Sequence, residues 1–250
     1  IAFCRLTINT DFWGLYTLIE SVSKPFLKSR LGEESGTLYD YEYTDDYRFT
    51  YKGDGLDAYV PVPFEPQTNE GKLDTGLPEF IKAINQTPQS GYAAAMETYI
   101  DVKKFLTHLA VENACAEYDG IVGQFGLNNF FLYQYGGQKK FVFIPWDKDT
   151  SFQAAEWPVQ YRMDTNEFTK RLMQDPAMKS YYESEVKRIA TNFVTTAFLG
   201  GKIDTFANMI RASVAADTHK PFTVADFEAS VAGLKGIMAA RAGNVASQVP

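Results

Sequence analysis

Two acidic residues directly follow an apolar run near the middle of the chain. The run FVFIP covers residues 141–145, Trp146 comes next, and Asp147 and Asp149 follow. Residues two positions apart point to the same face of a strand, so the two carboxylates share a face if the extended form continues that far. Carboxylates on one face repel each other unless a cation lies between them, and Mg²⁺ accepts one or two carboxylates together with substrate phosphates. The pattern predicts a metal site, and the alternative is a turn in which Asp149 caps the next segment.

Three polar residues earlier in the chain belong to the same hypothesis. Asp119 follows a helical pattern, and Asn128 and Asn129 come nine and ten positions later, at the start of another apolar run. If the two apolar runs pair as a hairpin, one of these asparagines lies near Asp147. In protein kinases, a first Asp orients the acceptor hydroxyl, while an Asn and a second Asp bind magnesium. An acid at a helix C-terminus opposes the helix dipole, which favours a functional role for Asp119, whereas simple turn chemistry is the alternative for both asparagines.

A helix and a hairpin are the elements that must position these residues. The segment 101–117 has the i, i+3, i+4, i+7 spacing of an amphipathic helix, with Asp101 as its N-cap and an end near Glu117. The runs NNFFLYQY and KKFVFIPWD flank Gly136 and Gly137, which is a strong hairpin signal. The apolar stripe of the helix consists of Val102, Phe105, Leu106, Leu109 and Ala110.

The rest of the chain predicts an α+β fold. A hairpin with its turn at 9–11 opens the chain, a short helix closed by Gly32 follows, and the last third is helical. The predicted segments are strands 1–8 and 12–20, short strands and loops over 36–66, a linker-like loop over 67–76, a helix over 77–86, and several helices from 166 onward.

Composition excludes several classes of protein. The 250 residues are 45% hydrophobic and carry a net charge of −7, which argues against a protein that binds nucleic acid through its phosphates. No apolar run approaches the roughly 20 residues of a membrane helix. The chain begins at Ile1 within a predicted strand, so we expect the natural start to lie further upstream.

Cysteine and histidine offer little chemistry of their own. Cys4 and Cys115 could form a disulfide or be small buried residues, and the absence of a CxxC or Cys/His cluster argues against structural zinc. The two histidines are His108, in a helical pattern, and His219. A Ser-His-Asp triad has no GxSxG motif to support it.

The run YDGIVGQFGLNNFFLYQYGGQKKFVFIPWDKDTSF resembles the signature of the CotH kinase family, the spore-coat-protein-H-like atypical kinases. In that family an Asp is followed by an Asn before a Tyr-rich strand and then by a WDxD segment. The stretch from Leu6 to Asp40, with Gly-Leu-Tyr between its strands, and the C-terminal helices with Arg241 are also similar to the family. The resemblance covers nearly the whole chain, and its WDxD block is the specific part.

The resemblance implies a bilobal, protein-kinase-like fold that transfers the γ-phosphoryl group of ATP to Ser or Thr of a protein substrate. The substrate and the kinase would be secreted, at the cell surface or in a spore coat. Residues 1–66 would form a partial N-lobe with a hinge-like region, and 67–250 a helical C-lobe with the catalytic hairpin. Asp119 would be catalytic, Asp147 would bind Mg²⁺ or Mn²⁺ with Asn128 or Asn129, Asp149 would support the metal site, and Glu20 would lie near the adenine of ATP. The alternative for Glu20 is a strand-end carboxylate that makes a local bond.

One departure from the family keeps other interpretations open. Family members carry an upstream basic residue that contacts the nucleotide, and Lys24, Lys28 and Arg30 follow Glu20 and cannot take its place. Without that residue a kinase loses electrostatic stabilisation, so the chain as given could be inactive. The first alternative is a non-catalytic surface, coat or adhesion protein, which the 15 tyrosines favour. The second is a metal-dependent hydrolase, which would need more converging ligands than the sequence offers.

Overall fold

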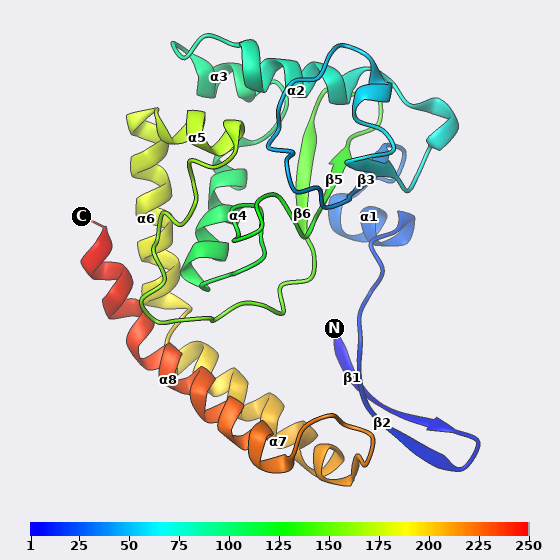
Figure 1. Cartoon of the computed structure of the whole chain (residues 1–250), viewed down its shortest axis with the longest axis vertical. Helices are drawn as coiled ribbons and strands as arrows, with labels where there is room; N and C mark the ends of the chain where they lie inside the picture. Colours follow the sequence, from blue (N-terminus) through cyan, green and yellow to red (C-terminus); the bar gives the residue numbers. More distant parts are fainter. Residues whose placement is uncertain (250) are drawn as a thin grey trace.

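Eight α-helices and two antiparallel sheets make up the described part of the chain, which is residues 1–249 of this computed structural model (Figure 1). Residue 250, the last of the predicted C-lobe, lies outside the described residues. The predicted α+β class is confirmed. The helices are α1 (Lys24–Leu31), α2 (Gly76–Gln86), α3 (Tyr92–Met96), α4 (Val102–Ala114), α5 (Glu167–Met173), α6 (Pro176–Asn192), α7 (Gly201–Ala216) and α8 (Val224–Gln248). The strands are β1 (Ala2–Ile8), β2 (Asp11–Leu18), β3 (Thr37–Tyr41), β4 (Phe64–Pro66), β5 (Phe130–Gln134) and β6 (Phe141–Pro145). Two 3₁₀-helices, η1 (Leu56–Ala58) and η2 (Glu70–Lys72), and a π-helix, η3 (Thr196–Gly200), complete the elements.

The larger sheet has the strand order β4-β3-β5-β6 and contains the predicted central hairpin. Strands β5 and β6 pair from Phe130 with Pro145 to Gln134 with Phe141, and the turn between them includes Gly137 in a left-handed conformation, with φ +67°. Because strand residues alternate between faces, Phe130 packs into the main core and Phe131 packs on the other side, under α1. Both faces of the sheet are therefore buried, which explains why β5 and β6 are continuous apolar runs.

Helix α4 packs against β6 through aromatic side chains. The Phe105 and Phe143 ring centroids lie 4.6 Å apart, and Phe168 of α5 stacks on Phe105 at 4.8 Å. All five residues of the predicted apolar stripe of α4 are buried. Asp101 is the N-cap, as predicted, since its side chain accepts a hydrogen bond of 2.9 Å from the backbone N–H of Lys104. This packing places the C-terminus of α4 beside the end of β6.

The C-terminus of α4 comes three residues earlier than the predicted end at Glu117. Ala116 adopts a left-handed conformation, with φ +53°, and its N–H donates to the carbonyl of Asn113. The N–H of Glu117 donates to the carbonyl of Glu112. These two bonds form a Schellman motif, which turns the chain away from the helix axis before Asp119.

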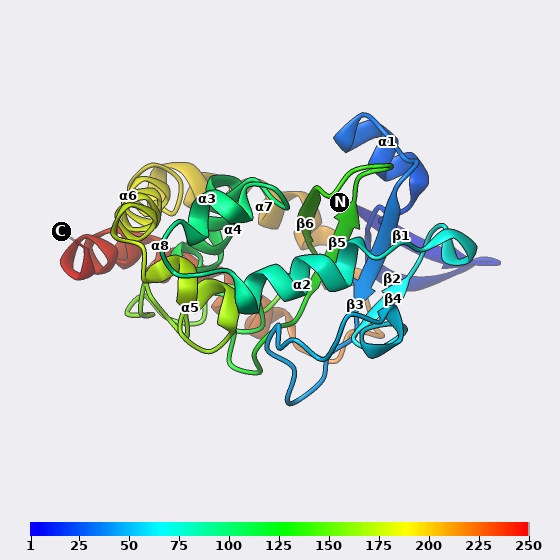
Figure 2. The same ribbon diagram turned by 90° about the horizontal axis from the view of Figure 1, so that it is seen from above.

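The C-terminal helices flank the core and then extend away from it (Figures 1 and 2). Helix α6 packs on α4, and α8 packs on α6. Helix α8 begins with a capping box between Thr223 and Asp226 and contributes Arg241 to the core, where its side chain is fully buried. Among residues 1–249, no helix combines the length and the apolar composition that crossing a bilayer requires.

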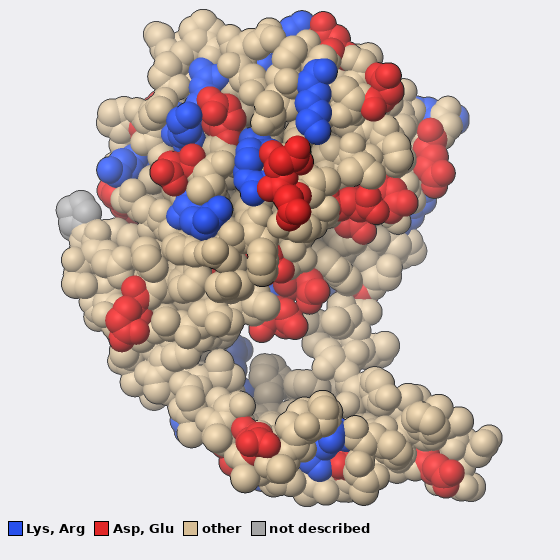
Figure 3. All heavy atoms as spheres, viewed as in Figure 1, with Lys and Arg blue, Asp and Glu red and all other residues tan. Residues whose placement is uncertain are grey.

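The β1–β2 hairpin, predicted from the sequence, lies against α7 rather than against the larger sheet (Figure 1). The backbone N–H of Leu15 donates to Asp217 at 2.9 Å, and the Trp13 ring stacks on His219. The space-filling view shows an opening between this pair of elements and the rest of the molecule (Figure 3).

Cys4 on β1 and Cys115 at the end of α4 are free thiols. Strands from both sides of the predicted 67–76 boundary pair in one sheet, and the division into two lobes stays a prediction.

Candidate functional site

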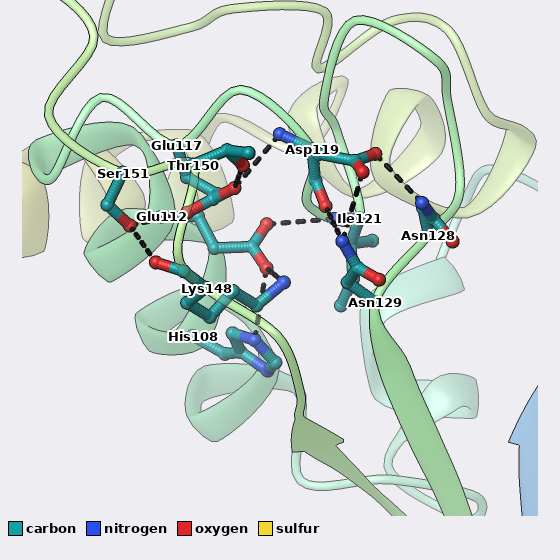
Figure 4. Close-up of polar contacts among 10 residues, drawn as sticks. All are labelled: His108, Glu112, Glu117, Asp119, Ile121, Asn128, Asn129, Lys148, Thr150 and Ser151. Carbon is teal, nitrogen blue, oxygen red and sulfur yellow. Dashed lines mark hydrogen bonds and ion pairs between the residues drawn. The ribbon is translucent and has the colours of Figure 1, made fainter. Parts of the chain in front are cut away.

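Asp119 lies in the loop after α4, where two asparagine side chains contact it (Figure 4). The amide of Asn128 donates to Asp119 Oδ1 at 2.9 Å. The amide of Asn129 donates to the backbone carbonyl of Asp119 at 2.8 Å and to its Oδ2 at 3.1 Å. The structure thus brings together three of the residues singled out from the sequence, although their roles stay predictions.

Asn129 also connects Asp119 to the end of β6. Its backbone carbonyl accepts a hydrogen bond of 3.1 Å from the N–H of Trp146, the residue directly before Asp147. Both Asn129 and Asp147 have left-handed backbones, with φ of +55° and +46°. Asn and Asp adopt this conformation more readily than other non-glycine residues, and such positions cluster at functional sites.

The condition under which Asp147 and Asp149 would share a face of a strand is not met. Strand β6 ends at Pro145, and the left-handed conformation of Asp147 interrupts the extended backbone, so strand alternation does not apply to this pair. Both carboxylates are exposed, and neither has a hydrogen bond or ion pair within residues 1–249. They are therefore available to a ligand from solution.

Glu117, which sequence reasoning did not select, connects the two candidate segments. It is buried, and its Oε1 accepts a hydrogen bond of 2.9 Å from the backbone N–H of Asp119. The hydroxyl groups of Thr150 and Ser151, directly after Asp149, also donate to its carboxylate (Figure 4). One buried carboxylate therefore contacts both the Asp119 loop and the segment that follows Asp149.

Glu112 is a second buried carboxylate that sequence reasoning missed. Its Oε1 lies 2.7 Å from the ammonium of Lys148 and 3.3 Å from Nε2 of His108, and its Oε2 accepts from the backbone N–H of Ile121 at 3.0 Å. Burial by itself would raise the pKa of Glu112, but Lys148 and His108 outweigh burial and lower this pKa to about 2. Glu112 is thus an anion at neutral pH. Its charge is compensated by Lys148, which lies between Asp147 and Asp149 in the chain.

A signal for Glu112 exists in the sequence. Leu109 belongs to the apolar stripe of α4, and Glu112 and Asn113 follow it at i+3 and i+4, on the same face. Polar residues on a buried helix face need partners, so they mark a polar network. Lys148 gave no such signal, because a lysine between two acids is ordinary turn composition.

The free side-chain oxygen atoms of the candidate residues are of the type that a hard cation prefers. The amide nitrogens of Asn128 and Asn129 bond to Asp119, which leaves their side-chain oxygens free to accept, and Asp147 and Asp149 have free carboxylates. Within residues 1–249, no group of three His, Cys, Asp or Glu residues could hold an ion alone. These are the ligand types that Mg²⁺ and Mn²⁺ accept, in sites where few protein ligands share the ion with nucleotide phosphates.

Glu20 lies outside this network. It follows β2, and its carboxylate pairs with Arg30 of α1 at 3.1 Å, where both side chains are at least half exposed. Its predicted place near adenine stays a prediction.

A cavity of about 710 Å³ lies between α4 and the β5–β6 hairpin. Its walls include apolar side chains such as Phe105, Val142 and Pro145. Lys148 and Glu112 are among its charged lining residues. Neither Asp119 nor Asp147 lines it. The candidate metal ligands therefore do not line this cavity, although Lys148 between two of them does.

Comparison with known proteins agrees with the resemblance in the sequence. A family model described as CotH kinase protein matches residues 1–245. The chain belongs to the CotH kinase family. The inner spore coat protein H of Bacillus subtilis (strain 168) is 24% identical to this CotH-family chain over 237 residues, which cover 90% of the chain. The chain spans 63% of the length of that relative.

Proposed function

We propose that this CotH-family chain carries the phosphoryl-transfer site of an atypical protein kinase, with ATP as donor and Ser or Thr of a protein as acceptor. The observation that carries the proposal is the path from Asp119 through Asn129 to Trp146 and Asp147. It joins an acid after a helix, an asparagine before a strand and a second acid after the paired strand. These are the three polar positions that phosphoryl transfer uses in protein kinases.

Asp119 would orient the acceptor hydroxyl. Each of its carboxylate oxygens accepts one hydrogen bond from an asparagine, and each keeps a second acceptor direction. A Ser or Thr hydroxyl bonded there would attack the γ-phosphorus, and the bond from that phosphorus to the β,γ-bridging oxygen would break. ADP would leave, and the hydroxyl proton would pass to the Asp119 carboxylate. The hydrogen bonds from the two asparagines would therefore supply positioning, which is most of what a kinase contributes.

Asp147 would hold the metal with Asn128 or Asn129, and Asp149 would support them. When bound, Mg²⁺ or Mn²⁺ would neutralise the charge that develops on the phosphate oxygens. Asn129 is the stronger candidate of the two asparagines, because its carbonyl also bonds to the N–H next to Asp147. Its left-handed backbone and that of Asp147 lie at facing ends of the same hairpin.

The family and its relative extend the proposal to fold and location. We infer a bilobal kinase-like fold, with β1–β2 in a partial N-lobe and the larger sheet and helices in the C-lobe. The relative is named as an inner spore coat protein, which favours a spore coat or another extracellular surface for this chain and its substrate. Glu20, after β2, would lie at the hinge between the lobes.

Thermal unfolding with and without nucleotide tests the proposal. A ligand that binds only the folded state raises the melting temperature. We expect ATP with Mg²⁺ or Mn²⁺ to raise the Tm of the wild-type protein, with a smaller shift for Asp147→Ala. Equal shifts in the two proteins would contradict the assigned metal site.

A non-catalytic surface protein is the second candidate. The β1–β2 hairpin and α7 expose large apolar side chains, among them Trp13, Tyr16 and Leu18 on the hairpin and Phe206 and Met209 on α7. Exposed apolar patches of this kind often mark contacts with other macromolecules. This candidate predicts no change in Tm with ATP and either metal.

A further inference from the structure

Lys148 lies between the two candidate metal ligands, yet its ammonium contacts a buried acid. The Nζ atom is 2.7 Å from Oε1 of Glu112, whose side chain is 4% exposed. A lysine placed between Asp147 and Asp149 would be well located to contact a phosphate. Its charge is instead compensated inside the protein.

The second carboxylate oxygen of Glu112 contacts the loop that contains Asp119. Oε2 accepts a hydrogen bond of 3.0 Å from the backbone N–H of Ile121, two residues after Asp119. A Cβ atom at Gly120 would lie 2.5 Å from that oxygen, so the loop approaches the carboxylate as closely as glycine allows. One carboxylate therefore contacts the segment with Asp147 and the loop with Asp119 at once (Figure 4).

We propose that Lys148 and Glu112 act as a positioning pair, which sets the segment with Asp147 and Asp149 at the correct distance from the loop with Asp119. The inference rests on the proposed kinase function and assigns residues that bind neither nucleotide nor acceptor. Displacements of about 1 Å between reacting groups reduce turnover by about 10²-fold. The pair thus controls turnover more than nucleotide affinity.

The rival interpretation is that Lys148 binds the phosphates of ATP. A free ammonium near the phosphates would lower KM and stabilise charge in the transition state. In that case Glu112 only competes for the lysine, and removing its charge would leave activity unchanged or higher. The two interpretations therefore differ in the sign of the effect of Glu112→Gln.

A double-mutant cycle on kcat and on KM for ATP separates them. The positioning pair predicts that Lys148→Met and Glu112→Gln each lower kcat by about 10- to 100-fold, with KM for ATP changed by less than about threefold. The double variant should lose no more than the worse single variant, because both changes break the same connection. Lys148→Arg keeps a cation opposite Glu112 and should recover at least part of kcat.

An exposed ion pair between the β5–β6 turn and α2 provides the matched control. Lys139 and Glu79 lie 2.7 Å apart, with 61% and 39% of their side chains exposed. Lys139→Met and Glu79→Gln remove the same charges at the same distance, away from Asp119. Both should keep wild-type kcat and KM.

Folding is checked by the melting temperature of each variant. Lys148→Met leaves the buried Glu112 carboxylate with His108 as its one charged-type partner, whereas the double variant removes both charges of the pair. The double variant is therefore the one to use if a single variant fails to fold. A higher KM for ATP in Lys148→Met together with unchanged constants in Glu112→Gln overturns the positioning pair but keeps the kinase. Additive losses, or wild-type kcat in folded variants, also overturn it. A wild-type protein that transfers no phosphate overturns the proposed function and the positioning pair together.

Discussion

Asn129 contacts Asp119 with a single amide group that donates twice, to the backbone carbonyl at 2.8 Å and to the carboxylate at 3.1 Å. Asn128 donates once, to the other carboxylate oxygen. The two asparagines are adjacent in the chain but differ in what they stabilise. Asn129 orients the peptide and the side chain of Asp119, whereas Asn128 contacts the side chain alone.

This difference predicts unequal losses of stability. Asn129→Ala removes two hydrogen bonds, at about 1 kcal/mol each, and places alanine at φ +55°, which costs about 1 kcal/mol more. We expect a loss of roughly 2–3 kcal/mol, against about 1 kcal/mol for Asn128→Ala. Urea unfolding measures both, and equal losses would contradict the assigned contacts.

The charge of Glu112 predicts a specific pH dependence. Its pKa is about 2 in the folded protein and 4.5 as the ordinary value, so its contribution is fully present above pH 4.5 and is lost as the pH falls toward 2. The whole contribution is on the order of 3 kcal/mol, of which about 2 kcal/mol should disappear by pH 3. The difference in unfolding free energy between wild type and Glu112→Gln should therefore shrink between pH 6 and pH 3. Glu70→Gln, at an exposed position in η2, supplies the control, and a constant difference for Glu112→Gln would refute the prediction.

Ala116 and Ala114 offer a matched pair of substitutions, because both side chains are fully buried. Ala116 occupies the left-handed position of the Schellman motif after α4, where glycine avoids the steric cost of a Cβ atom. Ala116→Gly therefore relieves about 1–2 kcal/mol of backbone strain, which offsets the roughly 0.8 kcal/mol lost with the buried methyl group. Ala114→Gly, within the last turn of the same helix, loses the methyl group and about 1 kcal/mol of helix propensity with no such relief. Thermal unfolding should show Ala116→Gly to be at least about 1 kcal/mol more stable than Ala114→Gly, and equal stabilities would count against the motif.

Arg241 of α8 stabilises the end of α4, although 127 positions of sequence separate it from Ala114, whose carbonyl it contacts. Its fully buried guanidinium donates to the carbonyls of Asn113, Ala114, Ala155 and Trp157. Burial lowers its pKa to about 10, so it stays charged at neutral pH and complements the partial negative charge of the helix C-terminus.

The ammonium group of a lysine cannot donate to the same four carbonyls as the planar guanidinium does. Arg241→Lys should lower the unfolding free energy by about 3 kcal/mol or more, because it leaves buried carbonyls without donors. Arg211→Lys, in an exposed pair with Glu228, is the matched control and should cost less than about 1 kcal/mol. Urea unfolding midpoints compare them, and similar losses at both positions would refute the role of Arg241.

Local patterns predicted the elements around the site. The glycines at 136–137 specified the β5–β6 hairpin, and the apolar stripe with Asp101 specified α4. Once these two elements are known, the proximity of Asp119 to Asn128 and Asn129 follows, because the short connection between helix and hairpin leaves few other arrangements. Hydrogen bonds from both asparagines to Asp119 show that proximity, whereas the expectation from the sequence placed one of them near Asp147.

Long-range pairing could not be predicted in the same way. Strand β3 pairs with β5, with Leu38 opposite Tyr133, and such a register depends on contacts between distant segments. The end of β6 was also missed, since it depends on the left-handed backbone of Asp147. Glu117 was missed because its partners, Thr150 and Ser151, come together only after the chain folds.

Phosphate transfer from [γ-³²P]ATP, measured together with ATP binding, tests the kinase proposal most directly. Autophosphorylation and a mixed Ser/Thr peptide library serve as acceptors, with Mg²⁺ or Mn²⁺ present. Wild type, Asp119→Asn and Asp147→Asn are compared after their melting temperatures show that each is folded. We predict that Asp119→Asn lowers kcat by about 10²–10⁴-fold with ATP affinity near wild type, whereas Asp147→Asn loses both activity and affinity. Loss of ATP binding in Asp119→Asn with binding kept in Asp147→Asn would reverse the two roles, and unchanged phosphate transfer in both variants would contradict a kinase site at these residues.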